Sequence, residues 1–584
     1  FPAMPSSFLR AAELSFPLSA DDLSVAVDAH GYALFSGRDL VSISEPGDPA
    51  LPWHIVTVLL PPRADISAVS VFLTGVEFSP LPGRWEVAPA GPPTMWDGTR
   101  EVAMWPANTP IVNGRNVSTY GRDAFFPPQP LGRLETGSMR GWNLATFPIA
   151  RIRYNPAAGT LERLAGGEVR VVFDERTTVE MQRSAASDRI VAPRARGIVV
   201  NYDAAAPAYL AARTDACAAG GSTYVILTTR TLRSSLARLA EFASYKEARG
   251  FEVVVADEDD WGGGTGNTAA ERIRAWLAEN YLSMNIEYVL LVGDPNPSTG
   301  SVPMKFCSPY QGGCPTDFYY ADLTGDWDLN GNGVYGQISD FGAGGVDRNW
   351  DVLVGRIPYY GSAAEVDTAL AKVIAYEKET VAEASWRRRA LLPMVQFSSS
   401  CLMYQLGEEL RTDALIPNGW PYHRIYQSAY ELSPPPETVG TSVENTTDAW
   451  TAAPFGAVVW ATHGSSTSAS AVMDLARAAA LDDSRPSFVY QGSCDNACPE
   501  ASNNLSWTLL KNGCIAAVGA TRTSWYTYPA TSYKGTGTIG GVGYEYGHRL
   551  IAAEATCGEA LYGLKQEVAF GPDWCWQNYV VFYL

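Results

Sequence analysis

The chain has 584 residues, too many for one hydrophobic core, and at roughly 100–200 residues per domain three or four units are expected. Apolar residues make up 46% and charged residues 18%, which excludes a disordered chain. The net charge of −19 argues against nucleic acid as a partner, because a polyanion would be repelled and no cluster of Lys and Arg offsets this.

The first 180 residues are expected to form an all-β domain, either a sandwich or a barrel. Short runs with alternating apolar residues, at 54–61, 68–78 and 167–175, are separated by turns rich in proline and glycine. The same stretch has no helical period and no cluster of His, Asp or Cys that would carry chemistry. Domain 1–180 is therefore predicted to be structural or regulatory, not catalytic.

Residues 181–222 are predicted to be a linker. Alanines, glycines and isolated arginines follow one another there without strong periodicity. Arginines such as Arg196 and Arg213 would make this segment easy to cleave, so we expect a processing site within it.

From residue 223 onward strands and helices alternate, which predicts an α/β region with mainly parallel sheets. A buried type of strand at 223–229 is followed by an amphipathic helix, which Gly250 ends. The alternation then returns to the end of the chain. A break near residue 380 divides the region into two predicted subdomains, 223–380 and 381–584.

A histidine and a cysteine stand where two strands of the second subdomain end. His463 follows the apolar strand 457–462, and Cys494 follows the strand 487–491. The segment 471–483 is expected to form the crossover helix that neighbouring parallel strands require, so both side chains would lie at the carboxyl edge of one sheet. Since a neighbouring imidazole increases the reactive thiolate fraction, we predict that Cys494 is a nucleophile and His463 its general acid/base.

The glycine after the histidine completes this predicted site. Gly464 has no Cβ and allows a tight exit from the strand. Its N–H group, together with that of Cys494, can point at the oxyanion that develops on a substrate carbonyl.

The motifs around this pair resemble those of the gingipain-type cysteine peptidases, which share the caspase-like fold. ATHGSS at 461–466 and GSCDNACPE at 492–500 correspond to the His-Gly and Cys motifs of that family. The likeness covers most of 222–584, and the β-rich N-terminal third looks like the prodomain of that family. The resemblance implies a cysteine endopeptidase made as a secreted zymogen, whose own prodomain inhibits it until cleavage.

The resemblance also assigns individual residues. It implies that Cys494 is the nucleophile, that His463 is the general acid/base, and that the N–H groups of Gly464 and Cys494 form the oxyanion hole. Trp525, in the segment GATRTSW, matches a tryptophan that walls the pocket for the substrate's P1 side chain. Protein or peptide substrates are expected, and the P1 preference stays open.

One departure from the family concerns the acidic residue behind the histidine. The matching segment, LLPMVQFSSSC at 391–401, contains no carboxylate. Either Glu408, Glu409 or Asp413 reaches in from the following helix, or the enzyme works with a Cys–His dyad. In a dyad, a backbone carbonyl could fix the tautomer of the imidazole.

The stretch 326–337 has the spacing of the first half of an EF-hand-type calcium loop, and structural Ca²⁺ is expected there. Its ligands would be the side chains of Asp326, Asp328 and Asn330 and the carbonyl of Asn332. The twelfth position holds Gln337 instead of Glu, so Asp322 or Asp340 would have to complete the site. An Asx-rich turn without metal is the alternative.

Two cysteines indicate an oxidising compartment. Cys307 and Cys314 flank a short turn that a disulfide could close, although two free thiols remain an alternative. No window of ~20 apolar residues predicts a transmembrane helix. No signal peptide is seen at the start, which opens on Phe1 and not on Met, and the apolar run at 578–584 ends without a turn. We expect a secreted monomer whose natural chain continues, with a missing C-terminal region able to attach it to the cell surface.

Three other functions compete with a cysteine peptidase. The first is a catalytically inactive caspase-like protein that serves as a surface or binding module. The second is a serine hydrolase, but Ser493 lacks the second glycine of GxSxG and the well-placed histidine precedes it. The third is a metal hydrolase, which five scattered histidines without HExxH do not support.

Overall fold

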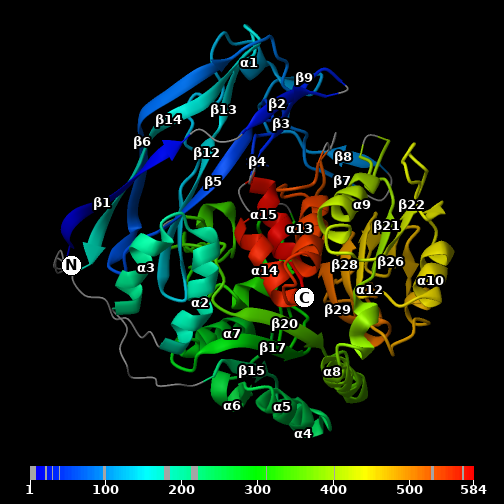
Figure 1. Cartoon of the computed structure of the whole chain (residues 1–584). Coiled ribbons are helices and arrows are strands. Elements are labelled where there is room, and N and C mark those ends of the chain that lie inside the picture. The colour runs from blue at the N-terminus through cyan, green and yellow to red at the C-terminus, as the bar shows by residue number, and fades with distance from the viewer. Residues whose placement is uncertain are drawn as a thin grey trace.

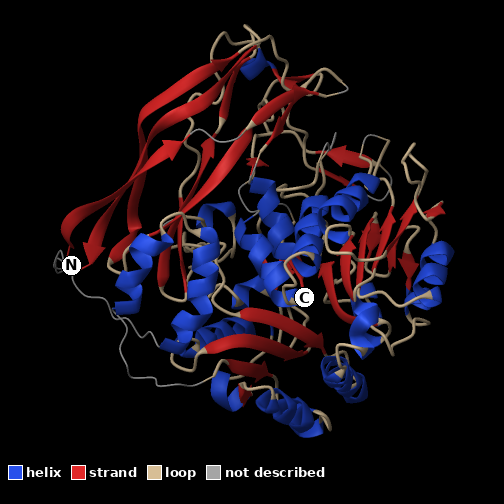
Figure 2. Ribbon diagram, in the orientation of Figure 1, coloured by secondary structure: helices blue, strands red, loops and turns tan. Residues whose placement is uncertain are grey.

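A computed structural model gives the fold of the chain (Figure 1). It describes residues 8–19, 23–28, 30–37, 40–96, 100–176, 185–211, 221–310, 312–342, 344–399, 401–527, 532–567, 571 and 573–584. A β-rich N-terminal domain lies beside a larger α/β region, in which helices surround the strands (Figure 2).

The N-terminal domain consists of antiparallel sheets. One sheet has the order β1-β14-β13 with β6 also paired to β14, and another has the order β11-β12-β5-β4. The strands of this domain are β1 (Phe8–Ser19), β2 (Ser24–Val27), β3 (Ala33–Ser36), β4 (Leu40–Ser42), β5 (Pro52–Leu59), β6 (Ala64–Leu81), β7 (Thr94–Trp96), β8 (Glu101–Ala103), β9 (Ile111–Val112), β10 (Arg115–Asn116), β11 (Glu135–Met139), β12 (Trp142–Ala150), β13 (Ile152–Asn155) and β14 (Thr160–Arg176), with one short helix, α1 (Val117–Tyr120).

The two larger sheets of this domain share one core. In β14, Val169, Val171 and Phe173 are buried at alternate positions, as the period of a strand requires. They belong to the same cluster as Val58 of β5 and Phe147 of β12, which lie in the other sheet. The prediction of a mostly β N-terminal region is confirmed.

The predicted linker is largely helical. Helices α2 (Ala185–Ile198) and α3 (Tyr202–Ala211) occupy its middle, and they pack on the sheet of β5 and β12. Each contains a proline, and α3 has no strong apolar stripe, so periodicity does not reveal the pair. Burial against Trp142 stabilises them instead, because Tyr209 stacks on that ring at 4.7 Å. Arg196 lies in α2, whereas Arg213 is outside the described residues.

The first α/β subdomain is built on a parallel sheet of order β16-β15-β17-β20. Its helix α8 shows why helices form here: Ser362 caps the first turn, and Val366, Leu370 and Ile374 bury one face. The elements are β15 (Thr223–Leu227), α4 (Arg230–Ser235), α5 (Leu239–Ala248), β16 (Glu252–Ala256), α6 (Glu258–Trp261), α7 (Gly266–Asn280), β17 (Ile286–Gly293), β18 (Lys305–Cys307), β19 (Cys314–Thr316), β20 (Leu353–Pro358) and α8 (Ala363–Lys378).

The second subdomain has a seven-stranded sheet of order β23-β22-β21-β24-β28-β29-β30, parallel except for β30. Its elements are β21 (Ala390–Met394), α9 (Tyr404–Leu410), β22 (Tyr422–Tyr426), β23 (Thr438–Val439), α10 (Val443–Ala452), β24 (Ala457–Ala461), β25 (Gly464–Ser465), β26 (Ser468–Ala469), β27 (Met473–Asp474), α11 (Leu475–Ala478), β28 (Ser487–Gly492), α12 (Leu505–Lys511), β29 (Cys514–Ala520), α13 (Ile539–Ile551), α14 (Cys557–Glu567), α15 (Asp573–Val581) and β30 (Phe582–Tyr583). The prediction of parallel sheets in the α/β region is confirmed.

Two details of this subdomain differ from the sequence analysis. The crossover 471–483 holds only the four-residue helix α11, preceded by the small sheet β25-β26-β27. The apolar run at the end is mostly helix α15, and only Phe582–Tyr583 forms a strand. Both errors concern short apolar segments, whose helical or strand state periodicity cannot decide.

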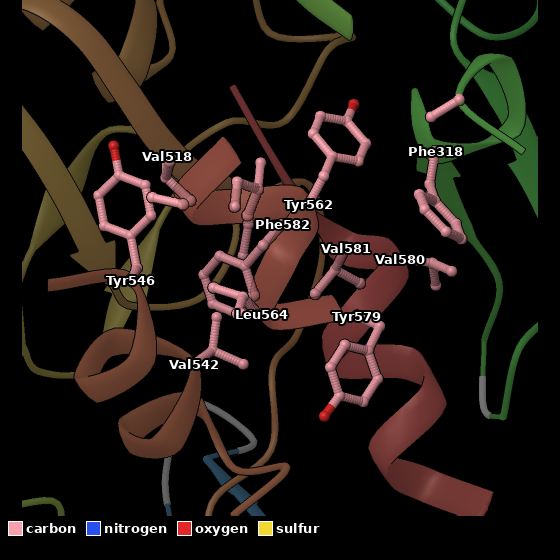
Figure 3. Packing of buried hydrophobic residues seen from close by; sticks show 14 of the residues in the cluster. Phe318, Val518, Val542, Tyr546, Tyr562, Leu564, Tyr579, Val580, Val581 and Phe582 are labelled. Atoms are coloured by element: carbon pink, nitrogen blue, oxygen red, sulfur yellow. The ribbon is translucent and has the colours of Figure 1, made fainter. Parts of the chain in front are cut away.

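A continuous apolar core joins the two subdomains. Figure 3 shows the side chains of α14, α15 and β30 between Phe318 of the first subdomain and Val518 of the second. The N–H group of Arg356 in β20 also donates to the carbonyl of Leu584. This shared core fixes the two sheets relative to each other. No helix in the described part of the chain is long and apolar enough to cross a membrane.

Candidate active site

The sheet brings the predicted histidine and cysteine to the same edge. Strands β24 and β28 are parallel neighbours, and Ala461 pairs with Gly492 at their carboxyl ends. His463 and Cys494 each lie two residues beyond this pair. The two residues therefore leave the sheet at the same carboxyl edge, from neighbouring strands.

Gly464 is in contact with the backbone of the cysteine. A Cβ at this position would lie 2.7 Å from the carbonyl oxygen of Cys494 and 2.8 Å from Cβ of Ser493. Distances below 3.0 Å leave no room for a side chain, so only glycine lets the two loops approach this closely.

The N–H group of Gly464 is not used by its small sheet. Ser470 donates to the carbonyl of His463, which makes Gly464 and Ala469 a non-hydrogen-bonded pair of the antiparallel ladder. The N–H group of Cys494 likewise has no acceptor among the described residues. Among the described residues, neither predicted oxyanion donor has a backbone acceptor.

A backbone carbonyl stands where the family places an acid. Nε2 of His463 lies 3.1 Å from the carbonyl oxygen of Phe397, in the segment that lacks a carboxylate. The carbonyl can only accept, so Nε2 carries the proton and Nδ1 is the basic nitrogen. The ring of Phe397 lies 5.0 Å from the imidazole and stacks on Tyr526 at 4.5 Å.

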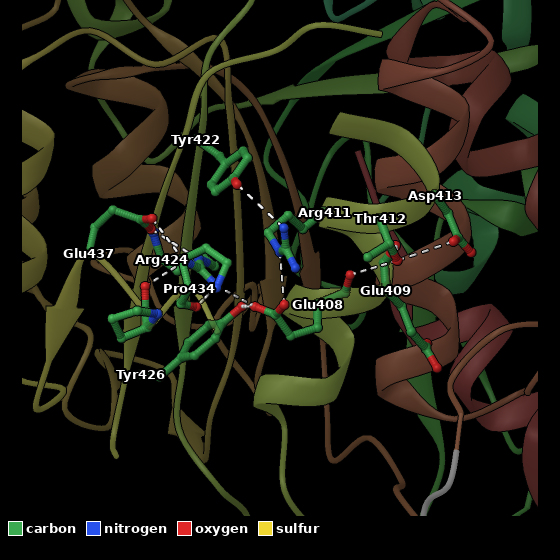
Figure 4. A network of polar contacts seen from close by, with 11 residues as sticks. Glu408, Glu409, Arg411, Thr412, Asp413, Tyr422, Arg424, Tyr426, Pro434 and Glu437 are labelled. Carbon is green, nitrogen blue, oxygen red and sulfur yellow. Dashed lines mark hydrogen bonds and ion pairs between the residues drawn. The ribbon is translucent and has the colours of Figure 1, made fainter. Parts of the chain in front are cut away.

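The three candidate acids have other partners. Glu408 binds Arg411 and Arg424 in the network of Figure 4, with N–O distances of 2.8 Å in both ion pairs. Glu409 accepts the N–H group of Tyr533 at 3.0 Å. Asp413 accepts the hydroxyl of Tyr544 at 2.7 Å. These contacts occupy all three carboxylates, and the carbonyl of Phe397 is the group that meets Nε2 of the histidine.

The resting thiol is protonated. Burial raises the pKa of Cys494 to about 11, and hydrogen bonds with Ser524 oppose only part of this rise. The N–H group of Ser524 lies 3.4 Å from Sγ. Burial also lowers the pKa of His463, against the effect of the Phe397 carbonyl. At neutral pH the pair is therefore a neutral thiol and a neutral imidazole, and thiolate formation needs a change in its surroundings.

Asn496 links the two loops, and the sequence analysis did not identify it. Its buried amide donates to the carbonyls of Ser465 and Ser468, at 2.6 and 3.0 Å, in the loop that follows His463. Its Oδ1 accepts the hydroxyl of Ser493, which itself accepts the indole N–H of Trp460 at 3.1 Å. This chain of hydrogen bonds fixes the nucleophile loop relative to the histidine loop.

Replacement of Asn496 tests this positioning role. In Asn496→Ala the two carbonyls lose their donor, so peptide cleavage is expected to fall by about 10- to 100-fold, mainly in kcat. Asn496→Asp keeps the shape but replaces the donor with an acceptor, and a similar loss is expected. Activity within threefold of the unsubstituted chain in both variants would contradict the assignment.

Trp525 lies next to the thiol's partner Ser524 and is buried. Its ring meets that of Tyr310 edge to face at 5.9 Å, and its backbone N–H donates to Oδ1 of Asn578 at 2.7 Å. Its indole nitrogen has no partner among the described residues. That it walls a P1 pocket stays a prediction.

The N-terminal domain contacts the chain near this edge of the sheet. Strand β7 forms an antiparallel bridge with the segment after Trp525, in which Thr94 donates to Tyr526 at 2.7 Å and accepts from it at 3.2 Å. Glu101 of β8 accepts the hydroxyl of Tyr526 at 2.7 Å. The β7–β8 hairpin thus reaches the residue that stacks beside Phe397 and His463.

The other predicted sites lie away from this edge. Cys307 and Cys314 face each other across the β18–β19 hairpin and are both free thiols. In the loop 326–337 Asp328 accepts the N–H group of Gly333, so this carboxylate takes part in a turn. No group of three or more His, Cys, Asp or Glu in the described ranges is arranged to hold a metal. The disulfide and the calcium site stay predictions.

Comparisons with known proteins agree with the motifs. The model of peptidase family C25 matches residues 218–584. Among solved structures, the Arg-specific cysteine proteinase gingipain R is 17% identical, with 64% of this chain and 78% of that chain covered and a TM-score of 0.47. The complex of the Porphyromonas gingivalis RgpB pro- and mature domains is 20% identical, with 35% and 95% covered and a TM-score of 0.23. No curated protein matches.

The family match extends over more than half of the chain and includes both strand ends of the candidate site. It confirms the resemblance that the His-Gly and Cys motifs indicate. The chain therefore belongs to peptidase family C25, the gingipain family of cysteine peptidases.

Proposed function

We propose that the chain is a secreted cysteine endopeptidase in its zymogen form, with Cys494 as nucleophile and His463 as general acid/base. The observation that carries this proposal is the register of β24 and β28, in which Ala461 pairs with Gly492 and each of the two residues lies two positions further on, at the same edge of the sheet. The carbonyl of Phe397 supports it, because it leaves the basic Nδ1 for the thiol.

The residues divide the reaction into two steps. Nδ1 of His463 takes the thiol proton, and Sγ of Cys494 bonds to the substrate carbonyl carbon. The oxyanion that forms accepts hydrogen bonds from the N–H groups of Gly464 and Cys494. The imidazolium then gives its proton to the leaving amine as the C–N bond breaks. In the second step, water attacks the thioester while the imidazole takes its proton, and the thiol and the new carboxyl product are released.

Latency in this proposal comes from the N-terminal domain. The β7–β8 hairpin occupies the backbone of Tyr526 by a strand-like bridge, which is how an extended peptide substrate would also be held. Burial raises the pKa of the Cys494 thiol to about 11, which favours its protonated form. Cleavage between the domains would let the hairpin leave.

The test compares the intact chain with a chain cut between residues 212 and 220. Peptides that vary at P1 are incubated with each form, and the cut form, at high dilution, is expected to cleave at least one peptide class. The intact form is expected to be at least tenfold slower. An inactive cut form with native circular dichroism would favour the alternative, a catalytically inactive caspase-like surface or binding protein.

Calcium binding by the loop 326–337 stays part of the proposal. Asp340 is buried beneath the loop, and its pKa is raised by burial and by the nearby Asp326 and Asp328 carboxylates. A cation would relieve this repulsion. We expect a chelator to lower the melting temperature by several degrees in the unsubstituted chain, and not in a chain with both Asp326→Ala and Asp328→Ala. The same chelator effect in both chains would place the ion elsewhere, and no effect in either would argue against calcium.

We also propose that the protein is secreted. Outside the cytoplasm the facing thiols of Cys307 and Cys314 would oxidise to a disulfide, since their strands are already paired at these residues. Protein isolated without reductant is then expected to show a peptide that joins the two cysteines in mass spectrometry.

A further inference from the structure

A second contact region joins the N-terminal domain to the catalytic region. It consists of strand β11 and the turn at 140–141, which dock on the segment 347–351 and on Ile286; we call it the β11 interface. None of its residues belongs to the candidate active site. It differs from the β7–β8 contact in that nearly all of its charged groups are buried.

Arg140 is the centre of the β11 interface. It belongs to the turn after β11, has φ of 49°, and is 0% exposed. Its guanidinium donates to the carbonyl of Asp351 at 2.8 Å and also to the carbonyl of Ile286. Its backbone N–H donates to the carboxylate of Asp351 at 2.7 Å. All of these acceptors belong to the catalytic region, so the buried arginine of one domain finds its hydrogen-bond partners in the other.

The strand before Arg140 extends the contact. The N–H group of Ser138 donates to the buried carboxylate of Asp347 at 3.1 Å. Glu135 accepts Nε of Arg348 at 2.8 Å, with both side chains largely buried. A buried arginine between satisfied acceptors, surrounded by further polar pairs, is typical of the residues that dominate binding energy.

Gly137 shows that the two surfaces are shaped to fit. A Cβ at this position would collide with the carboxylate of Asp347 and would lie 2.7 Å from Nδ2 of Asn349. Its backbone does not need glycine for conformation, since it is an ordinary residue of β11 paired with Leu144. The missing side chain serves the contact with the catalytic region and not the N-terminal sheet.

The two contact regions differ in how strongly they can bind the N-terminal domain to the catalytic region. At the active site the described hairpin contributes one backbone bridge and the Glu101–Tyr526 hydrogen bond. The β11 interface contributes several buried, charge-assisted hydrogen bonds, each roughly twice as strong as a neutral one. Helix α2 adds Arg194, whose guanidinium lies 3.4 Å from the ring centroid of Trp350.

We propose that the β11 interface, anchored by Arg140, holds the N-terminal domain on the catalytic region after the chain is cut, while the β7–β8 hairpin only covers the active site. The partner that this surface fits is the chain's own cleaved N-terminal domain. The inference rests on the proposed function in taking that domain as the inhibitor, but its test measures binding and needs no peptidase activity.

The experiment uses the full chain with Cys494→Ala and a recognition sequence for a site-specific protease inserted between residues 212 and 220. After cutting, the two parts are expected to co-elute in size-exclusion chromatography at micromolar concentration. Arg140→Ala and, separately, Gly137→Val are each expected to raise the Kd by about 30-fold or more. Arg170→Ala is the matched control, since its partner Glu13 lies in the same domain, 2.6 Å away, and the Kd should not change.

Two outcomes overturn the proposal. One is separation of the unsubstituted parts under these conditions. The other is a Kd within threefold of the unsubstituted value in both Arg140→Ala and Gly137→Val. Circular dichroism of the uncut chains shows whether each variant folds, and if Arg140→Ala does not, Gly137→Val decides, because it keeps every charge. Absence of peptide cleavage in the cut chain with Cys494 restored would contradict the proposed function and leave the binding result standing.

Discussion

Replacement of Cys494 by alanine is expected to abolish peptide cleavage by the cut chain, with a loss in kcat on the order of 10⁶-fold. The reason is that alanine has no group that can form the bond to the substrate carbonyl. His463→Ala is expected to cost nearly as much, because the thiol, whose pKa is raised to about 11, then lacks the general base of the proposed mechanism. Initial rates on the best P1 peptide measure both variants.

The variant that lacks both side chains tests whether Cys494 and His463 act together. If Cys494 and His463 act as one unit, removing both costs no more than removing the cysteine alone. The matched control is Cys498→Ala, four residues further on, whose thiol lies 3.2 Å from Oε2 of Glu500. We expect that variant to retain activity. Loss of activity in Cys498→Ala together with retention in Cys494→Ala would show that the nucleophile is Cys498 and that its assignment to Cys494 is wrong.

The sequence could predict the strand ends but not what lies behind them. An apolar run that stops at His463 or Cys494 is a local pattern, and parallel pairing places such ends at one edge. The atom that meets Nε2 of the histidine is a main-chain oxygen of Phe397, and a carbonyl leaves no trace in residue identity. The absence of the acid could be seen in the sequence. The atom that takes its place could be identified only from the fold.

Asn496 was hidden for a related reason. An asparagine two residues after a cysteine also favours a simple turn, and its true acceptors are carbonyls 28 and 31 residues earlier in the chain. The helices at 185–211 were hidden by composition, because Pro193 and Pro207 stand inside them and predict a break in a helix. Their stability comes from packing on Trp142, a tertiary contact that local propensity does not contain.

Gly464→Ala is expected to lower kcat for peptide cleavage by about 10²- to 10³-fold with little change in KM. The added Cβ would lie 2.7 Å from the carbonyl of Cys494, so the two loops must separate and the N–H donors leave the oxyanion. The control is Gly197→Ala in helix α2, where a Cβ meets nothing within 4 Å and activity should not change.

A second measurement separates loss of the oxyanion hole from general damage to the site. Alkylation of Cys494 by iodoacetamide forms no oxyanion, so its rate in the cut Gly464→Ala chain should stay within about threefold of the unsubstituted rate, as measured on the Cys494 peptide by mass spectrometry. Slow alkylation in parallel with slow cleavage would mean that the thiol itself is displaced. Unchanged cleavage would show that the N–H group of Gly464 does not bind the oxyanion, and the donor would then have to be sought elsewhere in the loop that follows His463.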